Sequence, residues 1–245
     1  MIKRSFSQLN SAEECMFSHY LSKIKKVEGI ENYWSELGTI VHSILEEYDK
    51  GLVTNCADEF TLRYGKITSD IRQAAWDKGA YKWKTYGQIL KFFQNFKGFN
   101  TKAIFTELAF EYEIEDFLFT GFIDRGSYIN NNPNEGISVQ DYKISNKFTK
   151  KDLAKKLHQL YLYAPAIKNA YGKYPKEMIF YFVKSGEYYK EAFNEAKLKK
   201  SLKWACEANK KIIFAQEQNN FPATVNKFKC ANLCSYSEHC EFWNN

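Results

Sequence analysis

The sequence predicts an α/β fold, with an α/β core and an added helical part, and two observations lead to that prediction. Stretches with the apolar spacing of helices open the chain and return in its second half, whereas the middle holds runs rich in β-branched and aromatic residues. No low-complexity linker or internal repeat interrupts the 245 residues. We therefore expect one domain over 1–245, with a mainly helical part (1–100), a core (101–218) and a cysteine-rich tail (219–245).

The first 100 residues are predicted to be mainly helical. Residues 5–26, 33–50 and 68–97 are expected to form helices, and Ser7 is a suitable cap for the first of them. The second has an apolar stripe at helical spacing, made of Trp34, Leu37, Val41, Ile44, Leu45 and Tyr48. Such a stripe needs a partner surface, which the later part of the chain has to supply.

The middle of the chain is predicted to form neighbouring strands. Residues 104–114, 117–128 and 137–143 are rich in Val, Ile, Phe and Tyr. The segment 131–134, which contains Pro133, has the composition of a turn between the last two strands. We expect these two strands to lie side by side.

A helix, a strand and a long helix complete the core. Residues 151–171 are predicted to be helical, with Pro165 kinking the helix or ending its first part. A strand at 178–184 and an amphipathic helix at 193–218 follow, ahead of the cysteine-rich tail.

The composition narrows the class of protein. A hydrophobic share of 44% and a charged share of 26% are ordinary for a soluble globular protein, and no apolar run approaches the roughly 20 residues of a membrane span. The net charge of +6 suits a polyanionic partner, although lysine-rich cytosolic proteins share it. No signal peptide is evident near Met1, so we expect a cytoplasmic protein whose six cysteines are reduced. Gly65-Lys66 lacks the upstream glycine of a phosphate-binding loop, which excludes an ATP-driven machine.

Two acidic residues and a lysine fall on two predicted neighbouring strands. Asp124 ends the run Gly121–Asp124, and Asp141-Tyr142-Lys143 closes the next strand. Adjacent strands lie about 5 Å apart, so two carboxylates on one face can hold a single cation. Asp141 and Lys143 point to one side of the sheet and Tyr142 to the other. The alternative is that both acids merely end strands and that the lysine is a solvated charge, because Asp-x-Lys alone is common.

Other polar residues have helical positions. His42 follows Gly38 by four residues, and Gln159 and Tyr163 lie one turn apart on one helix face. The apolar stripe of that helix, Leu157, Leu160, Tyr161 and Ala164, leaves both off the line that faces the core. A lone histidine is more often a structural imidazole than a ligand.

The cysteines divide into two groups. Cys56 and Cys206 are isolated and fit small buried hydrophobic residues, whereas Cys230-x3-Cys234-x5-Cys240 is a dense cluster among polar residues. Thiolates in such a cluster indicate a soft metal, either zinc or an iron–sulfur cluster.

These pieces, in this order, resemble the RecB-like branch of the PD-(D/E)XK nuclease superfamily across nearly the whole chain. The pieces are residues 5–9 leading to Cys15 and Tyr20, Gly38 to His42 with Glu46, Gly121 to Asp124, Asp141 to Lys143, and the Gln159/Tyr163 helix. Ile123 replaces the proline of the nominal motif, and Asp141 stands where Glu is also common; both departures are tolerated within the superfamily. The resemblance implies a restriction-endonuclease-like core, a mixed central sheet flanked by helices.

The resemblance also implies roles for residues. His42, Asp124, Asp141 and the carbonyl of Tyr142 would bind Mg²⁺ or Mn²⁺, Asp124, Asp141 and Lys143 would be catalytic, and Gln159 and Tyr163 would hold the substrate. Glu107, on the preceding strand, is a weaker candidate for a supporting acid.

The tail resembles that of the iron–sulfur members, including the CRISPR-associated enzymes and the AddB-type nuclease domains. In these, a cysteine from the N-terminal region completes the site, so Cys15 would join Cys230, Cys234 and Cys240 around a [4Fe–4S] cluster. The first gap of the trio has three residues where two are typical. Zinc, with four cysteines or with His239 as one ligand, is the alternative.

The function implied is that of an exonuclease on single-stranded or frayed DNA, in phage recombination, DNA repair or CRISPR adaptation. A separate helicase, recombination or adaptation protein is the expected partner. Lysines gather on and after the proposed catalytic strand, as a phosphate-tracking groove requires: Lys143, Lys147, Lys150, Lys151, Lys155 and Lys156. The rival is a nucleic-acid-binding protein without catalysis, or a zinc-stabilised interaction protein.

Overall fold

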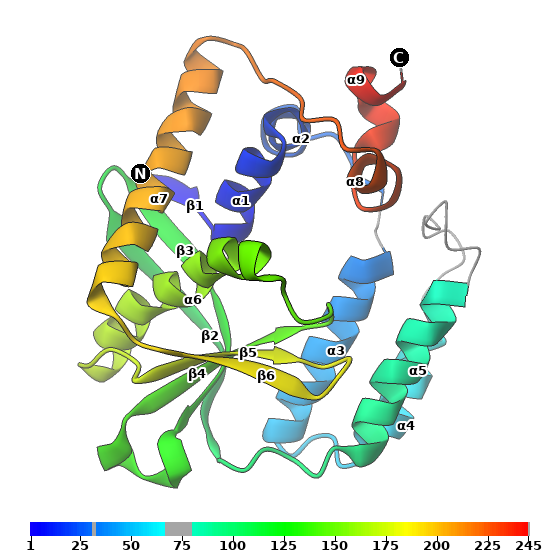
Figure 1. The fold of residues 1–245 in the computed structure, drawn as a ribbon, viewed down its shortest axis with the longest axis vertical. Coiled ribbons are helices and arrows are strands. Elements are labelled where there is room, and N and C mark those ends of the chain that lie inside the picture. Colours follow the sequence, from blue (N-terminus) through cyan, green and yellow to red (C-terminus); the bar gives the residue numbers. More distant parts are fainter. Residues whose placement is uncertain (31–32, 67–79, 245) are drawn as a thin grey trace.

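The computed structural model of the protein describes residues 1–30, 33–66 and 80–244 (Figure 1). Within these residues a six-stranded sheet has the order β1–β3–β4–β5–β6, with β2 paired to β3. The strands β1 and β3, and likewise β4 and β5, are parallel, and the other pairs are antiparallel. The strands are β1 (Ile2–Arg4), β2 (Ala103–Ile114), β3 (Phe117–Tyr128), β4 (Ile137–Lys143), β5 (Glu177–Phe182) and β6 (Glu187–Ala192).

Helices cover both faces of this mixed sheet, and the two chain ends lie on the side of α1 and α2 (Figure 1). The first half contributes α1 (Phe6–Glu14), α2 (Met16–His19), a π-helical turn (Tyr20–Ile24), α3 (Tyr33–Asp49), α4 (Cys56–Tyr64) and α5 (Ala80–Asn95). The second half contributes α6 (Lys150–Tyr171), α7 (Glu195–Glu217), α8 (Lys227–Asn232) and α9 (Glu241–Asn244). No described helix is both long and apolar enough to cross a membrane.

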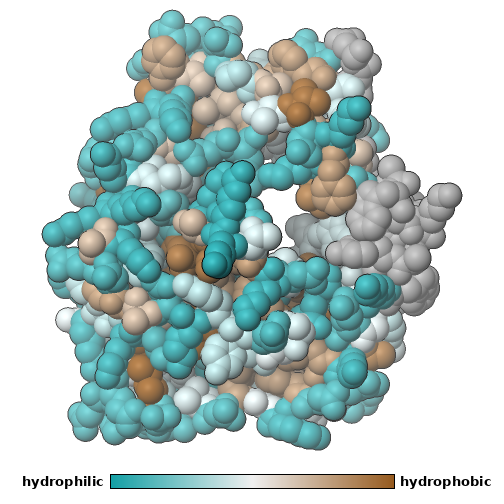
Figure 2. Space-filling model, viewed as in Figure 1, coloured by the Kyte–Doolittle hydropathy of each residue, from teal (hydrophilic) through white to brown (hydrophobic). Residues whose placement is uncertain are grey.

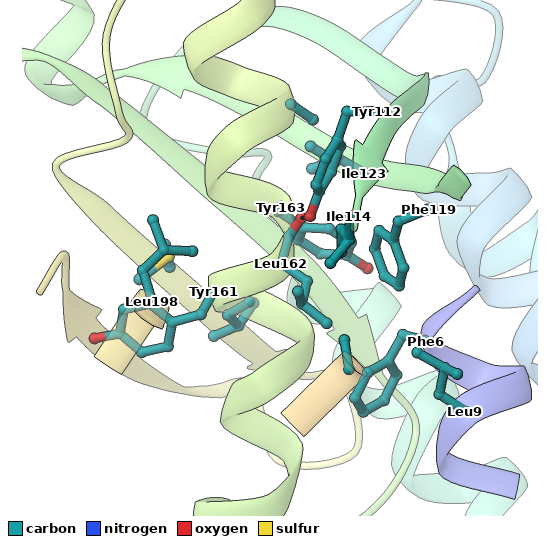
Figure 3. Packing of buried hydrophobic residues seen from close by; sticks show 14 of the residues in the cluster. Phe6, Leu9, Tyr112, Ile114, Phe119, Ile123, Tyr161, Leu162, Tyr163 and Leu198 are labelled. Atoms are coloured by element: carbon teal, nitrogen blue, oxygen red, sulfur yellow. Dashed lines mark hydrogen bonds between the residues drawn. The ribbon is translucent and has the colours of Figure 1, made fainter. Parts of the chain in front are cut away.

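Two hydrophobic clusters fix the helices to the sheet. One joins the sheet to α1, α6 and α7, and includes Phe6, Phe119 and Tyr161 (Figure 3). The other joins the opposite face to α3, α4 and α5, and includes Val41, with Tyr142 from β4. Burying each large side chain contributes roughly 1.5–3 kcal/mol. The sheet is thus held from both sides, and its middle strands are rigid supports for polar groups.

Most predicted elements are confirmed, with small differences in their bounds. The helix expected at 33–50 is α3, the three strands are β2, β3 and β4, and the helix at 193–218 is α7. The helix expected at 68–97 is described as α5 from Ala80, and residues 67–79 lie outside the described part.

Several local predictions were wrong. The helix expected at 5–26 is interrupted, because Cys15 has an extended backbone (φ −162°, ψ 107°) between α1 and α2. The cap of α1 is Ser5 rather than Ser7, and Ser5 and Gln8 form a reciprocal capping box. Of the two alternatives for Pro165, an end of the helix is excluded, because α6 continues through it to Tyr171, and a kink there stays a prediction.

Five short elements among the strands and α-helices were not predicted. They are β1, α4 and β6, of three, nine and six residues, and the two tail helices α8 and α9. The strand β1 is short for a recognisable alternation, and β6 is mostly exposed, so neither has the apolar pattern that identifies a strand in a sequence.

Candidate functional site

The candidate site lies where β3 and β4 separate. Their antiparallel pairing runs from Tyr128↔Ile137 to Arg125↔Gln140 and stops there, while β4 continues alongside β5. Asp124 lies just beyond the last pair, and its carboxylate Oδ2 accepts a hydrogen bond of 2.6 Å from the backbone N–H of Tyr142. The Asp124 carboxylate therefore accepts the hydrogen bond that the backbone of a paired strand would otherwise accept from Tyr142. Asp124 and Asp141 are both buried in the fork.

The helix α3 places His42 against this fork. Its Nε2 lies 3.1 Å from the carbonyl oxygen of Tyr142, and its Nδ1 lies 3.4 Å from Oδ2 of Asp124. Burial of the ring lowers its pKa, but the Asp124 carboxylate outweighs burial and raises the pKa of His42 to about 9. Both ring nitrogens face oxygen atoms of strand residues, so helix and strands converge on one point.

Glu107 of β2 completes a group of three ligand atoms. One atom each from His42, Glu107 and Asp124 lie within 4.8 Å of one another. Glu107 has a left-handed backbone (φ 45°), and on either side of it both Phe105 and Leu108 contact the hydrophobic core, so the strand alternation breaks at this residue. Such a conformation costs roughly 1–3 kcal/mol and is concentrated at functional sites. Burial and the Asp124 carboxylate raise the pKa of Glu107 to about 6.

Asp141 and Lys143 are held in a closed ring of contacts with α6. Lys143 Nζ lies 2.5 Å from Oδ2 of Asp141 and donates to Oε1 of Gln159 at 2.9 Å. Gln159 Nε2 donates to the Tyr163 hydroxyl at 2.8 Å, which in turn donates to Oδ1 of Asp141 at 2.8 Å. Burial raises the pKa of Asp141, and the Lys143 ammonium opposes that rise. All four side chains are therefore positioned relative to one another.

Tyr163 differs from its predicted location. It was expected off the core-facing side of the helix, yet it is buried among Tyr112, Ile114 and Phe119 (Figure 3). The four-residue spacing of Gln159 and Tyr163 does put them on one face, as predicted, but that face carries the polar ring and part of the core. Their predicted contact with substrate stays a prediction.

The donor set fits a hard divalent cation. One ligand atom each of Asp124, Glu107 and His42 lie within 4.8 Å of one another, and His42 lies 3.1 Å from the Tyr142 carbonyl oxygen. The buried carboxylate of Asp141 is in the same fork. Carboxylate and carbonyl oxygens are the ligands that Mg²⁺ and Mn²⁺ favour. Burial is the main cause of the raised pKa values of Glu107 and Asp141, and the Asp124 carboxylate adds to both.

Arg125 is buried beside the site and stabilises it, and no sequence motif indicated it. Arg125 is fully buried, and its Nε donates to Oδ2 of Asp49 at 2.7 Å. Its guanidinium lies 4.1 Å from the ring centre of Phe99 and also donates to the backbone oxygen of Thr101. Arg125 directly follows Asp124, and Asp49 ends the helix that carries His42, so this ion pair holds the two parts of the site together.

Two concave surfaces flank the fork. One, of about 590 Å³, is lined by His42, Glu46 and Glu107 on the α3 side. The other, of about 840 Å³, lies between the start of α1, the middle of β3 and α6, and Gln159 and Tyr163 are among its lining residues. The candidate site is therefore accessible from two directions.

The predicted cluster cysteines come together far from this fork. Cys15, Cys230, Cys234 and Cys240 all line one cavity of about 390 Å³ between α2 and the tail. Burial raises the pKa of the Cys240 thiol, and the neighbouring Cys15 and Cys234 raise it further. Four large apolar residues of the tail are exposed: Val225, Phe228, Leu233 and Phe242. Figure 2 shows brown surface in the upper part of the molecule, where Figure 1 places the tail helices. Cys56 and Cys206 are buried elsewhere, as predicted.

The four thiols line one cavity without forming a close group. Tetrahedral zinc with Zn–S bonds of about 2.3 Å requires thiols about 3.8 Å apart. Among the described residues, the group at His42 is the only set of three His, Cys, Asp or Glu ligand atoms within 4.8 Å of one another, so no three of the cysteines are that close. His239 is not among the residues that line the cavity.

Comparison with known proteins agrees with this geometry. A model of the PD-(D/E)XK nuclease superfamily matches residues 3–241. The chain belongs to this superfamily. Because PD-(D/E)XK enzymes are nucleases that typically use divalent metals, the fork at Asp124 and Asp141 is the expected place for such a metal.

Two solved structures match the chain, and the first of them supports the fold. The crystal structure of a proposed exonuclease from Eubacterium rectale is 14% identical, with a TM-score of 0.53, and the match covers 96% of this chain and 86% of that chain. The crystal structure of SSO0001 is 17% identical, with a TM-score of 0.34, and the match covers 96% and 94%. No curated protein matches the sequence at a significant level. The predicted fold class, a mixed sheet flanked by helices in a PD-(D/E)XK core, is confirmed.

Proposed function

We propose that this PD-(D/E)XK protein is a metal-dependent deoxyribonuclease that trims single-stranded or frayed DNA ends. The observation that carries the proposal is the convergence of His42, Glu107 and Asp124 within 4.8 Å, beside the Asp141–Lys143 ion pair. Acids and an imidazole from three separate elements meet where β3 and β4 separate. An ion pair with a purely structural role would not need these acidic and imidazole groups beside it.

The cation would be held by Asp124, Asp141, His42 and the carbonyl of Tyr142, with Glu107 as a further ligand. A divalent ion bound there supplies polarisation of the phosphate and a lower pKa for a water. His42 and Asp124 are already oriented by their contacts with Tyr142, at 3.1 Å and 2.6 Å. Little rearrangement is needed for these groups to bind a metal.

Lys143 would stabilise the negative charge that develops on the phosphate. Its ammonium is fixed between Asp141 and Gln159, so it acts as a preorganised positive charge in a partly buried environment. Gln159 and Tyr163 hold Lys143 and Asp141 in place. Gln159 is only half-buried and lines the concave surface of about 840 Å³. We propose that these two residues act chiefly through the groups they position.

The DNA strand would be attracted by lysines that follow β4. Lys150, Lys151 and Lys155 are exposed, whereas Lys143 and Lys156 are half-buried. Exposed lysines at the start of α6 supply charge for a phosphate backbone without fixing its sequence.

We also propose that Cys15, Cys230, Cys234 and Cys240 hold a [4Fe–4S] cluster. A shared cavity and thiols spaced more widely than zinc requires support this proposal. The cluster would close a loop from Cys15 to Cys240, most of the chain, and so join the N-terminal part, the core and the tail into one nuclease domain. Its role would be structural.

Degradation of end-labelled DNA tests the proposal. Anaerobically purified protein is incubated with single-stranded and duplex oligonucleotides, with Mg²⁺ or Mn²⁺ or with EDTA, beside Asp141→Asn. We expect cleavage of single strands that needs the metal and falls by about 10³-fold or more in the variant. Protein that is folded and cluster-loaded but cleaves no DNA would contradict the proposal.

A further inference from the structure

Phe122 is an aromatic side chain exposed in the middle of a central strand. Its side chain is 59% exposed, while Ile123, the next residue of β3, is fully buried. Among the described residues no aromatic ring pairs with it. Leaving a phenylalanine in water forgoes roughly 1.5–3 kcal/mol of burial. A ligand that covers this ring would recover part of that free energy.

The neighbours of Phe122 leave its ring uncovered. The residue opposite it on β2 is Ala109, which is itself exposed and offers only a methyl group. Because successive side chains of a strand point to opposite faces, Gly121 and Ile123 face away from the Phe122 ring. The small side chain of Ala109 leaves the surface beside the ring open, so a flat ligand has access to it.

Phe122 also lies next to the candidate catalytic groups. It precedes Asp124 by two residues, and Ala109, its partner, follows Glu107 by two. Two steps along a strand span about 7 Å. Phe122 lines the same cavity of about 840 Å³ as Gln159 and Tyr163, which bind the Lys143 and Asp141 side chains. A strand held at those groups therefore passes the ring.

We propose that Phe122 stacks on an unpaired base of the substrate strand, beside the phosphate to be cut. This proposal rests on the proposed nuclease function and deepens it. Stacking on an aromatic ring is independent of base identity, because every base has a π-face. A base inside a duplex already stacks on its neighbours and pairs with its partner, so it cannot cover the ring. Phe122 would thus give the enzyme its preference for single strands.

The test separates binding from cleavage. Fluorescence anisotropy in EDTA measures binding of a labelled oligodeoxynucleotide, single-stranded or as a blunt duplex, to the full chain carrying Phe122→Ala, Phe122→Trp or Phe214→Ala. We expect Phe122→Ala to weaken single-strand binding about tenfold and duplex binding little. Phe122→Trp, which keeps a stacking surface, should bind as the wild type does. Phe214, 63% exposed on α7, is the matched control and should have no effect.

Oligonucleotides with one abasic site locate the contact. The wild type should bind more weakly when one particular base is missing, and Phe122→Ala should lose that sensitivity. An unchanged affinity and abasic profile in Phe122→Ala, or equal weakening by Phe122→Ala and Phe122→Trp, would overturn the proposal. Cleavage by the wild type is measured separately: cleavage with no stacking effect rejects only this inference, and stacking without cleavage rejects only the nuclease function.

Discussion

The candidate active site and the cysteine cavity are organised in opposite ways. At the fork of β3 and β4, Asp141, Lys143 and Tyr163 already bind one another, with contacts of 2.5–2.9 Å in a ring that Gln159 closes. In the cavity the four thiols line one space, and Cys15 Sγ accepts a hydrogen bond from the Thr224 N–H at 3.4 Å. The first region is preorganised by contacts between its own side chains, whereas the second, under the proposal made above, would be completed by its cluster.

The largest effect on stability is expected at the cysteines of the proposed cluster. Cys234→Ala should lower the free energy of unfolding by several kcal/mol and remove iron, because bound metal contributes directly to folding. Cys206→Ala is the matched control, since Cys206 is buried outside the cavity. Thermal unfolding is followed by circular dichroism, with iron, acid-labile sulfide and zinc measured on the same samples. Wild-type metal content and melting in Cys234→Ala would show that the cavity holds no cluster, and zinc without sulfide would replace the iron–sulfur proposal.

The next largest loss of stability is expected on removal of the ion pair between Asp49 and Arg125, which joins α3 to β3. Asp49→Ala leaves Arg125 buried without a counter-charge, which costs about 3–5 kcal/mol. Glu47→Ala, on the same helix, removes a partner of the partly exposed Arg63 and should cost about 1 kcal/mol or less. Urea unfolding compares the two. Equal losses would mean that the buried pair is no more important than a surface pair, and that the site is held by packing alone.

These two regions also differ in how far a sequence can predict them. The motif residues Asp124, Asp141 and Lys143 were located because β-branched and aromatic runs identify their strands and because their spacing is local. The short connection between these strands predicted that they are neighbours, but not that they separate beyond Arg125 and Gln140. The cysteine trio is local as well, and only the resemblance placed Cys15 beside it.

What escaped prediction depends on the tertiary structure. Glu107 was predicted as a weaker candidate for a supporting acid, but its left-handed backbone has no signature in a Glu inside a strand-like run. The Arg125–Asp49 pair joins residues 76 positions apart. Tyr163 belongs both to the core and to the polar ring, a dual role that an apolar stripe cannot describe. Helix periodicity predicts which residues share a face of the helix, but not which atoms their side chains contact.

A smaller effect, on kcat, should distinguish a positioning role of Tyr163 from a role in substrate binding. Tyr163→Phe deletes the hydroxyl that donates to Asp141 and accepts from Gln159, and we expect kcat to fall about 10- to 100-fold with KM little changed. Tyr112→Phe deletes a hydroxyl of the same core that donates to the Leu162 backbone, so it should lower stability similarly but leave kcat unchanged. A rise in KM with unchanged kcat would instead assign Tyr163 to substrate binding.

The smallest effect per residue is expected from the lysines at the start of α6, since an exposed charge acts through counterion release and not through a fixed contact. The triple variant Lys150→Gln, Lys151→Gln, Lys155→Gln should weaken DNA binding modestly at low salt. It should also make the slope of log affinity against log salt shallower, by about 0.7 for each phosphate of a single strand that the protein no longer neutralises. The matched control changes Lys199, Lys200 and Lys203, which are exposed on α7.

Both triple variants remove the same formal charge, so an effect of net charge alone would change the two slopes equally. A shallower slope only in the α6 variant would place the DNA strand along α6, next to the ring that holds Lys143. Equal slopes in both variants would contradict a binding path there. Attraction of DNA would then arise from the overall charge of +6 and not from a groove beside the active site.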